Sequence, residues 1–343
     1  MSTLYGAMIG AGYFAQFHAE AWQRWNLAPR HPALMTAVVD AVPGRARELT
    51  GRYDLPRAYE SLEAMFDAER PQFVDIVTRP ESHLELVRIA AQRGAHVICQ
   101  KPMAPTWDDC LAMCEACERA GVRLLIHENW RWQAWYRAIR RLLDEDRCGR
   151  VVQATFFWRT GDGRGSEPYA AQPYFRTMPR LLVYETLVHL LDTFRFLFGE
   201  IQTVSCRNQR VNEAIAGEDQ SHIVVSFANG SCGVVDANRL TGPHPSAAAM
   251  GELWIEGDRA TLRMTADGQL LLREPGGPET RLPFEPPTTG YKGDSVYATQ
   301  AHCIECLVTG QPCESEGRDY LRTVRLVDAC YESHAAGHVI RVG

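Results

Sequence analysis

Short apolar runs alternate with amphipathic segments through the first 126 residues of the chain. The apolar runs predict strands at residues 5–9, 34–39, 73–77, 95–99 and 122–126. The spacing of apolar positions between them predicts helices at about 14–27, from Pro43 onward, at 81–93 and at 106–120. Because each strand is apolar along its whole length, we expect a parallel, doubly wound sheet covered by helices on both faces.

The remainder of the chain has a different pattern. It predicts strands at 151–158, 203–210, 222–227, 232–238, 252–256 and 260–264, and helices at 183–198, 296–309 and 318–336. Asn229-Gly230 between two of these strands is typical of a tight hairpin, so we expect a large, mostly antiparallel open sheet in an α+β domain. The alternation stops near His127, which predicts domains at 1–126 and 127–343.

Composition and charge narrow the class of protein. The chain has 343 residues, of which 45% are hydrophobic, and a formal net charge of -6. This mild negative balance argues against nucleic acid or an anionic membrane as a partner. No apolar run approaches the roughly 20 residues that span a bilayer, and the first residues lack the basic start of a secretion signal. We therefore expect a cytoplasmic protein.

The chain contains 11 cysteines, scattered over its length. In a protein of this size they indicate reduced, mostly buried thiols. Helical spacing places Cys110, Cys114 and Cys117 on one face, and Cys303 and Cys306 lie close to His302 in sequence. A zinc site requires such groups to converge in space with a further ligand, and we expect no metal.

A glycine-rich turn follows the first predicted strand. It reads Gly10-Ala11-Gly12-Tyr13-Phe14-Ala15 and matches G-x-G-x-x-A between a strand and a helix. In such turns the first glycine permits the tight bend, the second lets the backbone approach a pyrophosphate, and the small third residue lets helix and strand pack closely. Tyr13 and Phe14 open the helix, whose N-terminal N–H groups favour an anion. A purely structural turn is the alternative.

Asp40 ends the second predicted strand. A carboxylate at this position accepts hydrogen bonds from ribose hydroxyls and repels a 2′-phosphate, which favours NAD over NADP. Arg45, close by in the sequence, is a basic group that works against this preference.

Two further segments carry a family resemblance. Thr78-Arg79-Pro80-Glu81-Ser82-His83 resembles the T-x-P-x-x-H turn of the glucose–fructose oxidoreductase, inositol dehydrogenase and rhizopine catabolism family (GFO/IDH/MocA). The segment from His96 to Ala104 resembles the family's H-V-x-C-E-K-P-x-A strand and turn. The resemblance implies a Rossmann domain whose NAD site includes Thr78, Pro80, His83, Gln100 and Lys101, with Gln100 in place of the usual glutamate.

The family's third motif, D-x-G-x-H-x-x-D, has an altered counterpart from Glu185 to Asp192. His189 and Asp192 match the motif, whereas Glu185 and Leu187 replace its aspartate and glycine. Asp192 has a second interpretation, as a partner for Arg195 on the same helix.

The residues of these motifs suit the oxidation of a hydroxyl group. A histidine side chain ordinarily titrates near neutrality, and His189 is our candidate for the base that removes the proton. Glu185, one helical turn earlier, would orient the imidazole or contact substrate, and Lys101 would donate to the reacting oxygen. The alternative for His189 is a hydrogen-bonded histidine without a catalytic role.

Polar groups that follow the fifth strand and line the long loop at 161–179 are candidates for substrate binding. They are Asn129, Arg131, Arg164 and Arg176. Arg176 would hold a sugar acid or pair with a neighbouring carboxylate. Trp132 and Trp135 are expected to pack in the interior.

The resemblance also implies a nicotinamide held between the two domains and a homodimer or homotetramer formed through the antiparallel sheet. A closer similarity within the family, at Gly10–Phe14, His127–Asn129 and Gln172–Tyr174, implies oxidation of a branched pentose at its anomeric carbon to a lactone. The alternatives are an inositol, polyol or sugar-acid dehydrogenase, and an NAD-binding sensor without turnover. The presence of both Lys101 and His189 argues against the sensor.

Overall fold

A computed structural model describes residues 3–28, 32–242 and 251–342 of the chain. The chain forms two compact units. The first comprises Met1–Asn129 and Ser295–Val324, and the second Trp130–Asp294 and Arg325–Gly343. The segment 295–324 thus returns to the first unit, a return that a single division near His127 does not include.

The first unit is built on a six-stranded parallel sheet in the order β3-β2-β1-β4-β5-β6. Its strands are β1 (Leu4–Ile9), β2 (Ala33–Val39), β3 (Arg57–Tyr59), β4 (Phe73–Ile76), β5 (His96–Gln100) and β6 (Leu124–His127). The predicted parallel sheet is confirmed. The chain winds outward in opposite directions from β1 and β4, and this reversal opens a crevice beyond the carboxyl ends of the strands.

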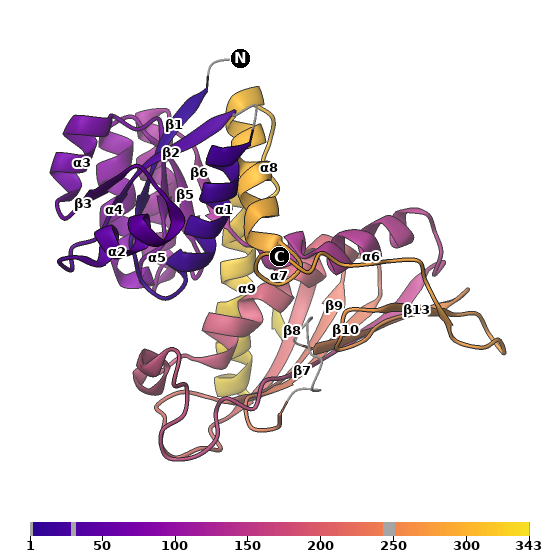
Figure 1. Cartoon of the computed structure of the whole chain (residues 1–343). Helices are drawn as coiled ribbons and strands as arrows, with labels where there is room; N and C mark the ends of the chain where they lie inside the picture. Colours follow the sequence, from indigo (N-terminus) through magenta and orange to yellow (C-terminus); the bar gives the residue numbers. More distant parts are fainter. Residues whose placement is uncertain (1–2, 29–31, 243–250, 343) are drawn as a thin grey trace. The chain divides into compact units, whose positions relative to one another are not determined.

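Helices pack on this sheet (Figure 1). They are α1 (Ala15–Leu27), α2 (Arg45–Tyr53), α3 (Leu62–Glu69), α4 (Pro80–Gln92), α5 (Trp107–Ala120) and α8 (Ser295–Thr309). Figure 1 shows α8 running alongside α1, and the two helices are in contact. Cys303 and Ile304 of α8 are fully buried in the same hydrophobic cluster as Trp22 of α1. This apolar face explains why the segment 295–324 belongs to the first unit.

The second unit contains a nine-stranded sheet in the order β14-β13-β12-β11-β7-β10-β9-β8-β15. Its strands are β7 (Val151–Arg159), β8 (Ile201–Gln209), β9 (Gln220–Phe227), β10 (Cys232–Asn238), β11 (Gly251–Gly257), β12 (Thr261–Met264), β13 (Leu270–Arg273), β14 (Thr280–Arg281) and β15 (Ile340–Arg341). Among the described strands of this second sheet, only β7 and β10 pair in parallel, which confirms the prediction of a mostly antiparallel sheet.

One face of this sheet is covered by α6 (Ala134–Asp144) and α7 (Val188–Phe198) (Figure 1). Phe194 of α7 packs edge-on against Phe227 of β9. A Cβ added at Gly233 of β10 would lie 2.8 Å from the ring of Phe194. The last helix, α9 (Gly317–Ala336), begins in the first unit and continues in the second.

The helix predicted at 183–198 is not α-helical throughout. Leu182–Leu187 forms a π-helix that leads into α7. The carboxylate of Glu218 accepts hydrogen bonds from the backbone N–H groups of Leu181 (3.2 Å) and Val183 (2.9 Å). A buried acid from a distant loop therefore satisfies donors that open this turn, and π-turns of this kind are frequent at functional sites.

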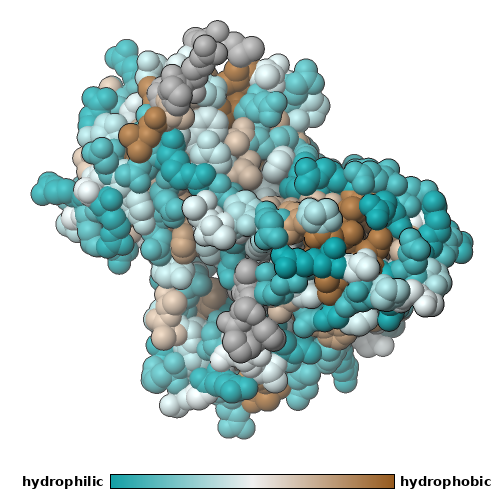
Figure 2. All heavy atoms as spheres, turned by 45° about the vertical axis from the view of Figure 1, so that its right-hand side comes forward, coloured by the Kyte–Doolittle hydropathy of each residue, from teal (hydrophilic) through white to brown (hydrophobic). Residues whose placement is uncertain are grey.

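The surface agrees with the composition. Figure 2 shows hydrophilic side chains over most of the face it presents, with hydrophobic ones gathered in smaller patches. Among the described helices, none combines the length and the apolar character needed to cross a membrane.

Candidate functional site

The glycine turn joins β1 to α1 at the crevice of the first sheet. Gly10 has φ +107°, a left-handed conformation that favours glycine. A Cβ at this position would lie 2.6 Å from the carbonyl oxygen of Val77. The turn thus requires glycine at residue 10 for reasons of the fold alone.

Gly12 is different, because a Cβ there would have no described protein atom within 4 Å. Protein packing therefore does not explain this glycine, whereas close approach of a phosphate does. Phe14, the N-cap residue of α1, makes no side-chain capping hydrogen bond, and Ala15 is fully buried against the sheet. Tyr13 is about half exposed beside them. The segment fits a dinucleotide pyrophosphate at the start of α1.

Asp40 follows β2 and links two turns. Its Oδ2 accepts a hydrogen bond from the N–H of Ala11 (2.7 Å), inside the glycine turn, and its Oδ1 accepts one from Val42 (2.8 Å). The structure thus brings the predicted ribose-binding acid against the predicted pyrophosphate turn. Arg45 is exposed at the first position of α2.

The turn between β4 and α4 is held by a buried histidine. His83 is fully buried, and its ring nitrogens lie 3.0 Å from the carbonyl oxygen of Met103 and 3.2 Å from that of Thr78. Burial lowers the pKa of His83, so its ring is neutral at physiological pH. Pro80 occupies the first turn of α4 and presets its geometry. The neutral ring donates to one of these carbonyl oxygens at a time, and it lies between the two turns that the family motifs describe.

Gln100 and Lys101 lie at the carboxyl end of β5. Gln100 is buried, and its Oε1 accepts a hydrogen bond from the backbone N–H of Lys101 (2.8 Å). The side-chain Nε2 of Gln100 lies 3.0 Å from Nε2 of His18. An amide side chain thus fixes the backbone at Lys101, which precedes a cis peptide bond to Pro102.

Beneath Gln100 lies a polar network that the sequence analysis did not identify. Oδ2 of the fully buried Asp75 lies 2.8 Å from Nδ1 of His18 and accepts a hydrogen bond from the indole N–H of Trp22 (2.7 Å). Burial opposes ionisation of Asp75, but the electrostatic interaction with His18 and the hydrogen bond to it outweigh burial and lower the Asp75 pKa. Burial also lowers the pKa of His127, at the end of β6, to about 3. His127 is therefore neutral at physiological pH.

Asn129, a predicted substrate ligand, is buried in the first unit, and its side-chain amide donates to Oγ of Ser295 (2.9 Å). The neighbouring Glu128 is fully buried and accepts a hydrogen bond from Tyr320 (2.9 Å). Both partners come from the segment that returns to this unit. The strand end is therefore held by residues far away in the sequence.

His189 lies near the start of α7 in the second unit and is 5% exposed. Its ring stacks on the indole of Trp130, with ring centroids 4.8 Å apart and planes inclined by 10°. The stacking fixes the orientation of the imidazole plane. Trp135 is buried as predicted.

Arg131 is bound to Asp192 rather than presented as a lone cation. Its Nε and Nη2 donate to the two carboxylate oxygens of Asp192, each at 2.7 Å, and both side chains are buried. Arg195, the alternative partner of Asp192, pairs mainly with Glu200 (3.0 and 2.8 Å). We therefore assign Arg131 to the support of α7, and Asp192 to the bidentate pair.

Glu185, in the π-helix, belongs to a cluster around a residue that the sequence analysis missed. Arg239 is buried, and its Nη2 donates to Oγ1 of Thr186 (2.6 Å) and lies 3.4 Å from Oε2 of Glu185. Its Nη1 donates to Asp162 (2.7 Å) from the long loop. Arg239 directly follows the strand predicted at 232–238, and this position at a strand end was the one sequence feature that could have indicated a role in the site.

The two remaining predicted arginines are engaged locally. Arg176 pairs with Glu167, the second of its two predicted interpretations. Arg164 donates from Nε to the carbonyl oxygen of Leu240. Neither is held inside the buried cluster of Arg239.

Comparison with known proteins agrees with these features. Residues 5–128 match the family profile described as "Oxidoreductase family, NAD-binding Rossmann fold", and residues 136–263 match the GFO/IDH/MocA C-terminal domain. The chain is 36% identical to a D-apiose dehydrogenase of Paraburkholderia graminis over 98% of this chain and 89% of that protein. It is 32% identical to a D-apiose dehydrogenase of Rhizobium rhizogenes over 100% and 99% of the two chains.

A solved structure is similar over the same extent. It is an oxidoreductase from Agrobacterium radiobacter in complex with NAD+, L-tartaric acid and magnesium, 31% identical, with a TM-score of 0.88 and coverage of 100% of this chain and 99% of that one. The glycine turn, the two-unit fold and the full-length similarity all indicate the same family. This chain belongs to the GFO/IDH/MocA family of oxidoreductases and carries that family's NAD-binding Rossmann domain.

Proposed function

We propose that this protein is an NAD-dependent dehydrogenase that oxidises D-apiose at its anomeric carbon to the lactone. The full-length similarity to two D-apiose dehydrogenases carries the proposal. The glycine turn that fits a pyrophosphate, with Asp40 against it, supports the cofactor.

In this reaction the C1–H bond breaks as the C1 hydroxyl loses its proton. NAD supplies the hydride acceptor when it is bound. His189 receives the hydroxyl proton, because a neutral imidazole is a competent base near pH 7. Lys101 donates a hydrogen bond to the same oxygen and stabilises the negative charge that develops on it. The products are the lactone, NADH and one proton.

Several groups position these two side chains. The stacked indole of Trp130 restricts His189 to one plane, and Gln100 fixes the backbone of Lys101. Arg239 contacts Glu185 and its neighbour Thr186, and we propose that Glu185 accepts a hydrogen bond from a sugar hydroxyl or orients the imidazole.

We propose NAD rather than NADP as the working cofactor. The Asp40 carboxylate, bound to the glycine turn, would lie where a 2′-phosphate would add negative charge. Arg45 is exposed and is not one of the residues whose backbone N–H groups bind Asp40. We propose that it contributes to the edge of the adenosine site.

The two alternative functions, a sugar-acid dehydrogenase and an NAD-binding sensor, would require different residues. A sugar-acid dehydrogenase would need an arginine for the carboxylate, but Arg131 and Arg176 are already paired with Asp192 and Glu167. An NAD sensor would have no use for the pair Lys101 and His189. Both observations favour turnover of a neutral sugar.

A substrate screen tests the proposal. Purified protein is mixed with NAD or NADP and with D-apiose, other aldoses, inositols or sugar acids, and NADH absorbance is followed. We expect the highest kcat/KM with D-apiose and NAD. A higher kcat/KM with inositols or sugar acids would overturn the substrate, and tight NAD binding without any turnover would favour the sensor.

We also propose that a second copy of the chain covers the outer face of the nine-stranded sheet, giving a homodimer or homotetramer. Val224, Val234, Thr155 and Trp254 stand opposite one another across four adjacent strands of that sheet. Val224 is 45% exposed, and Phe157 is 39% exposed on the same face. We expect Val224→Asp to reduce the mass measured by light scattering to that of a monomer, and an unchanged mass would contradict this interface.

The cysteines support a cytoplasmic location as part of the same proposal. All 11 are free, and only Cys232 is not buried. Free thiols in this number suit a reducing compartment. Fractionation of the native cells should find the protein with the cytoplasmic enzymes.

A further inference from the structure

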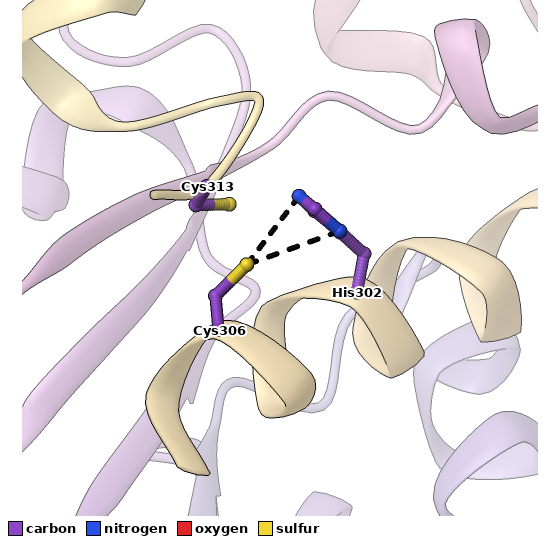
Figure 3. Close-up of side chains that lie close together, drawn as sticks. All are labelled: His302, Cys306 and Cys313. Atoms are coloured by element: carbon purple, nitrogen blue, oxygen red, sulfur yellow. Dashed lines mark hydrogen bonds between the residues drawn. The ribbon is translucent and has the colours of Figure 1, made fainter. Parts of the chain in front are cut away.

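A second group of reactive side chains lies in the first unit, around the segment that joins α8 to α9. His302 and Cys306 are one turn apart on α8, and Cys313 follows on the connecting segment (Figure 3). His302, Cys303 and Cys306 are close together in sequence, whereas Cys313 lies beyond the end of the helix and outside its spacing.

These three side chains converge in space. The ligand atoms of His302, Cys306 and Cys313 all lie within 4.8 Å of one another. Sγ of Cys306 lies 3.5 Å from Nε2 and 3.9 Å from Nδ1 of His302. Tetrahedral zinc with ordinary Zn–N and Zn–S bond lengths requires an N···S separation of about 3.6 Å. The measured separation therefore already agrees with a shared ion.

The backbone around the group is held by contacts that do not involve its sulfur atoms. Arg123 donates to the carbonyl oxygens of Cys306 and Gln311 and to the carboxylate of Glu316. The N–H of Ile126, on β6, donates to the carbonyl oxygen of Ser315 (2.8 Å). The connecting segment is thus attached to the edge of the sheet on both sides of Cys313, and the group is preorganised.

We propose that His302, Cys306 and Cys313 form a binding site for a zinc ion. Two thiolates and one imidazole are a ligand set that zinc prefers, and three protein ligands leave a fourth position for water. Cys306 and Cys313 are buried, whereas His302 is partly exposed and gives the ion a route from solvent. The bound ion would join the end of α8 to the segment that leads into α9.

When zinc binds, metal–ligand bonds replace hydrogen bonds that these side chains now make. The two thiols release their protons to solvent, and the thiolates and the imidazole bind the ion. The S–H of Cys306 now donates to the carbonyl of Pro312 (3.4 Å), and the N–H of Glu314 donates to Nε2 of His302 (3.0 Å). These are neutral hydrogen bonds, which are weaker than zinc–thiolate bonds.

The test uses the full chain, purified under reducing conditions and stripped of metal. Zinc is added, unbound zinc is removed, and the bound zinc is measured by elemental mass spectrometry. We expect one ion per chain, and a thiolate-to-metal absorption band when cobalt replaces zinc. The double variant C306S/C313S should lose both signals.

The matched control is Cys117→Ser, which removes a buried thiol of the same unit outside the group. It should retain the ion and the cobalt band. The wild-type spectrum needs no variant and keeps the test valid if C306S/C313S fails to fold. A wild-type chain that holds no zinc, or one whose mass shows Cys306 joined to Cys313 by a disulfide under these conditions, would overturn the proposal.

Discussion

The candidate groups of the two units are built in different ways. In the first unit, the groups proposed to hold the cofactor are largely backbone: a glycine turn, the start of α1 and the N–H groups that Asp40 arranges. In the second unit they are side chains from distant segments, as when Arg239 reaches both Glu185 and Asp162. Backbone sites depend on local sequence, whereas side-chain sites depend on the whole fold.

This difference leads to different sensitivities. A side chain that performs chemistry, or holds one that does, has no substitute nearby, so its loss should be costly. A backbone site loses only a part of its binding energy when one position is altered. The following predictions test this contrast, from the largest expected effect to the smallest.

The largest effect is expected for His189→Asn, which removes the proposed base while keeping a planar polar group on Trp130. We expect kcat with D-apiose to fall by about 10²- to 10⁴-fold, the usual contribution of a positioned acid–base group. Steady-state NADH formation measures it. A kcat within a factor of about three of the wild type would remove His189 from the chemistry.

A buried pair in the second unit should have the next largest effect. Asp192→Asn leaves the buried guanidinium of Arg131 without its counter-charge, and we expect a loss of about 3–5 kcal/mol in the free energy of unfolding. Glu332→Gln is the matched control, because Glu332 makes a bidentate pair with Arg325 in which both side chains are substantially exposed, and this pair should be worth less than about 1 kcal/mol. Urea unfolding compares them, and equal losses would contradict the assignment.

The buried network of the first unit predicts a pH dependence. The pKa of His127 is lowered to about 3 in the folded chain and returns to about 6.5 on unfolding. Below pH 6.5 the unfolded chain therefore binds a proton that the folded chain does not. Stability should fall as the pH decreases, by up to about 1.4 kcal/mol per pH unit.

This dependence is checked by unfolding the wild type and His127→Gln between neutral pH and pH 4. The variant should show a shallower loss of stability with acidification. Burial lowers the pKa of His83 as well, so a part of the loss remains. An identical slope in the two proteins would show that His127 does not stay neutral.

The smallest effect is expected at the backbone site. A methyl group at Gly12 meets no described protein atom but would stand where the pyrophosphate approaches, so Gly12→Ala should weaken NAD binding by about tenfold, or 1.4 kcal/mol. Gly51→Ala is matched, because a Cβ there is equally unobstructed but lies on α2. Calorimetric titration with NAD should separate the two, and equal affinities would remove Gly12 from the cofactor site.

The same contrast explains what the sequence could predict. The glycine turn, Asp40 and the parallel strands follow from local patterns. The short β3 and the eight-residue α3 were missed, although Ser61 accepts a hydrogen bond from Ala64 and is a recognisable helix start. The helix α6 was also missed, since no element was predicted between 127 and 151.

Other features depend on contacts that no local pattern contains. The π-helix is opened by Glu218, and Asp75 is linked to His18 across a long stretch of sequence. Arg239 and Cys313 likewise acquire their partners only when the chain is folded. Spacing along the chain gives no information about such pairs.

The central claim is that this family member turns over a sugar with NAD and does not merely bind the cofactor. It is tested most directly by Lys101→Ala, measured in parallel for NAD affinity and for NADH formation from D-apiose. We predict that the variant still binds NAD, since the glycine turn is intact, and that turnover falls by about 10²-fold or more. Unchanged turnover in the variant, or a wild type that binds NAD and forms no NADH from any sugar, would contradict the account.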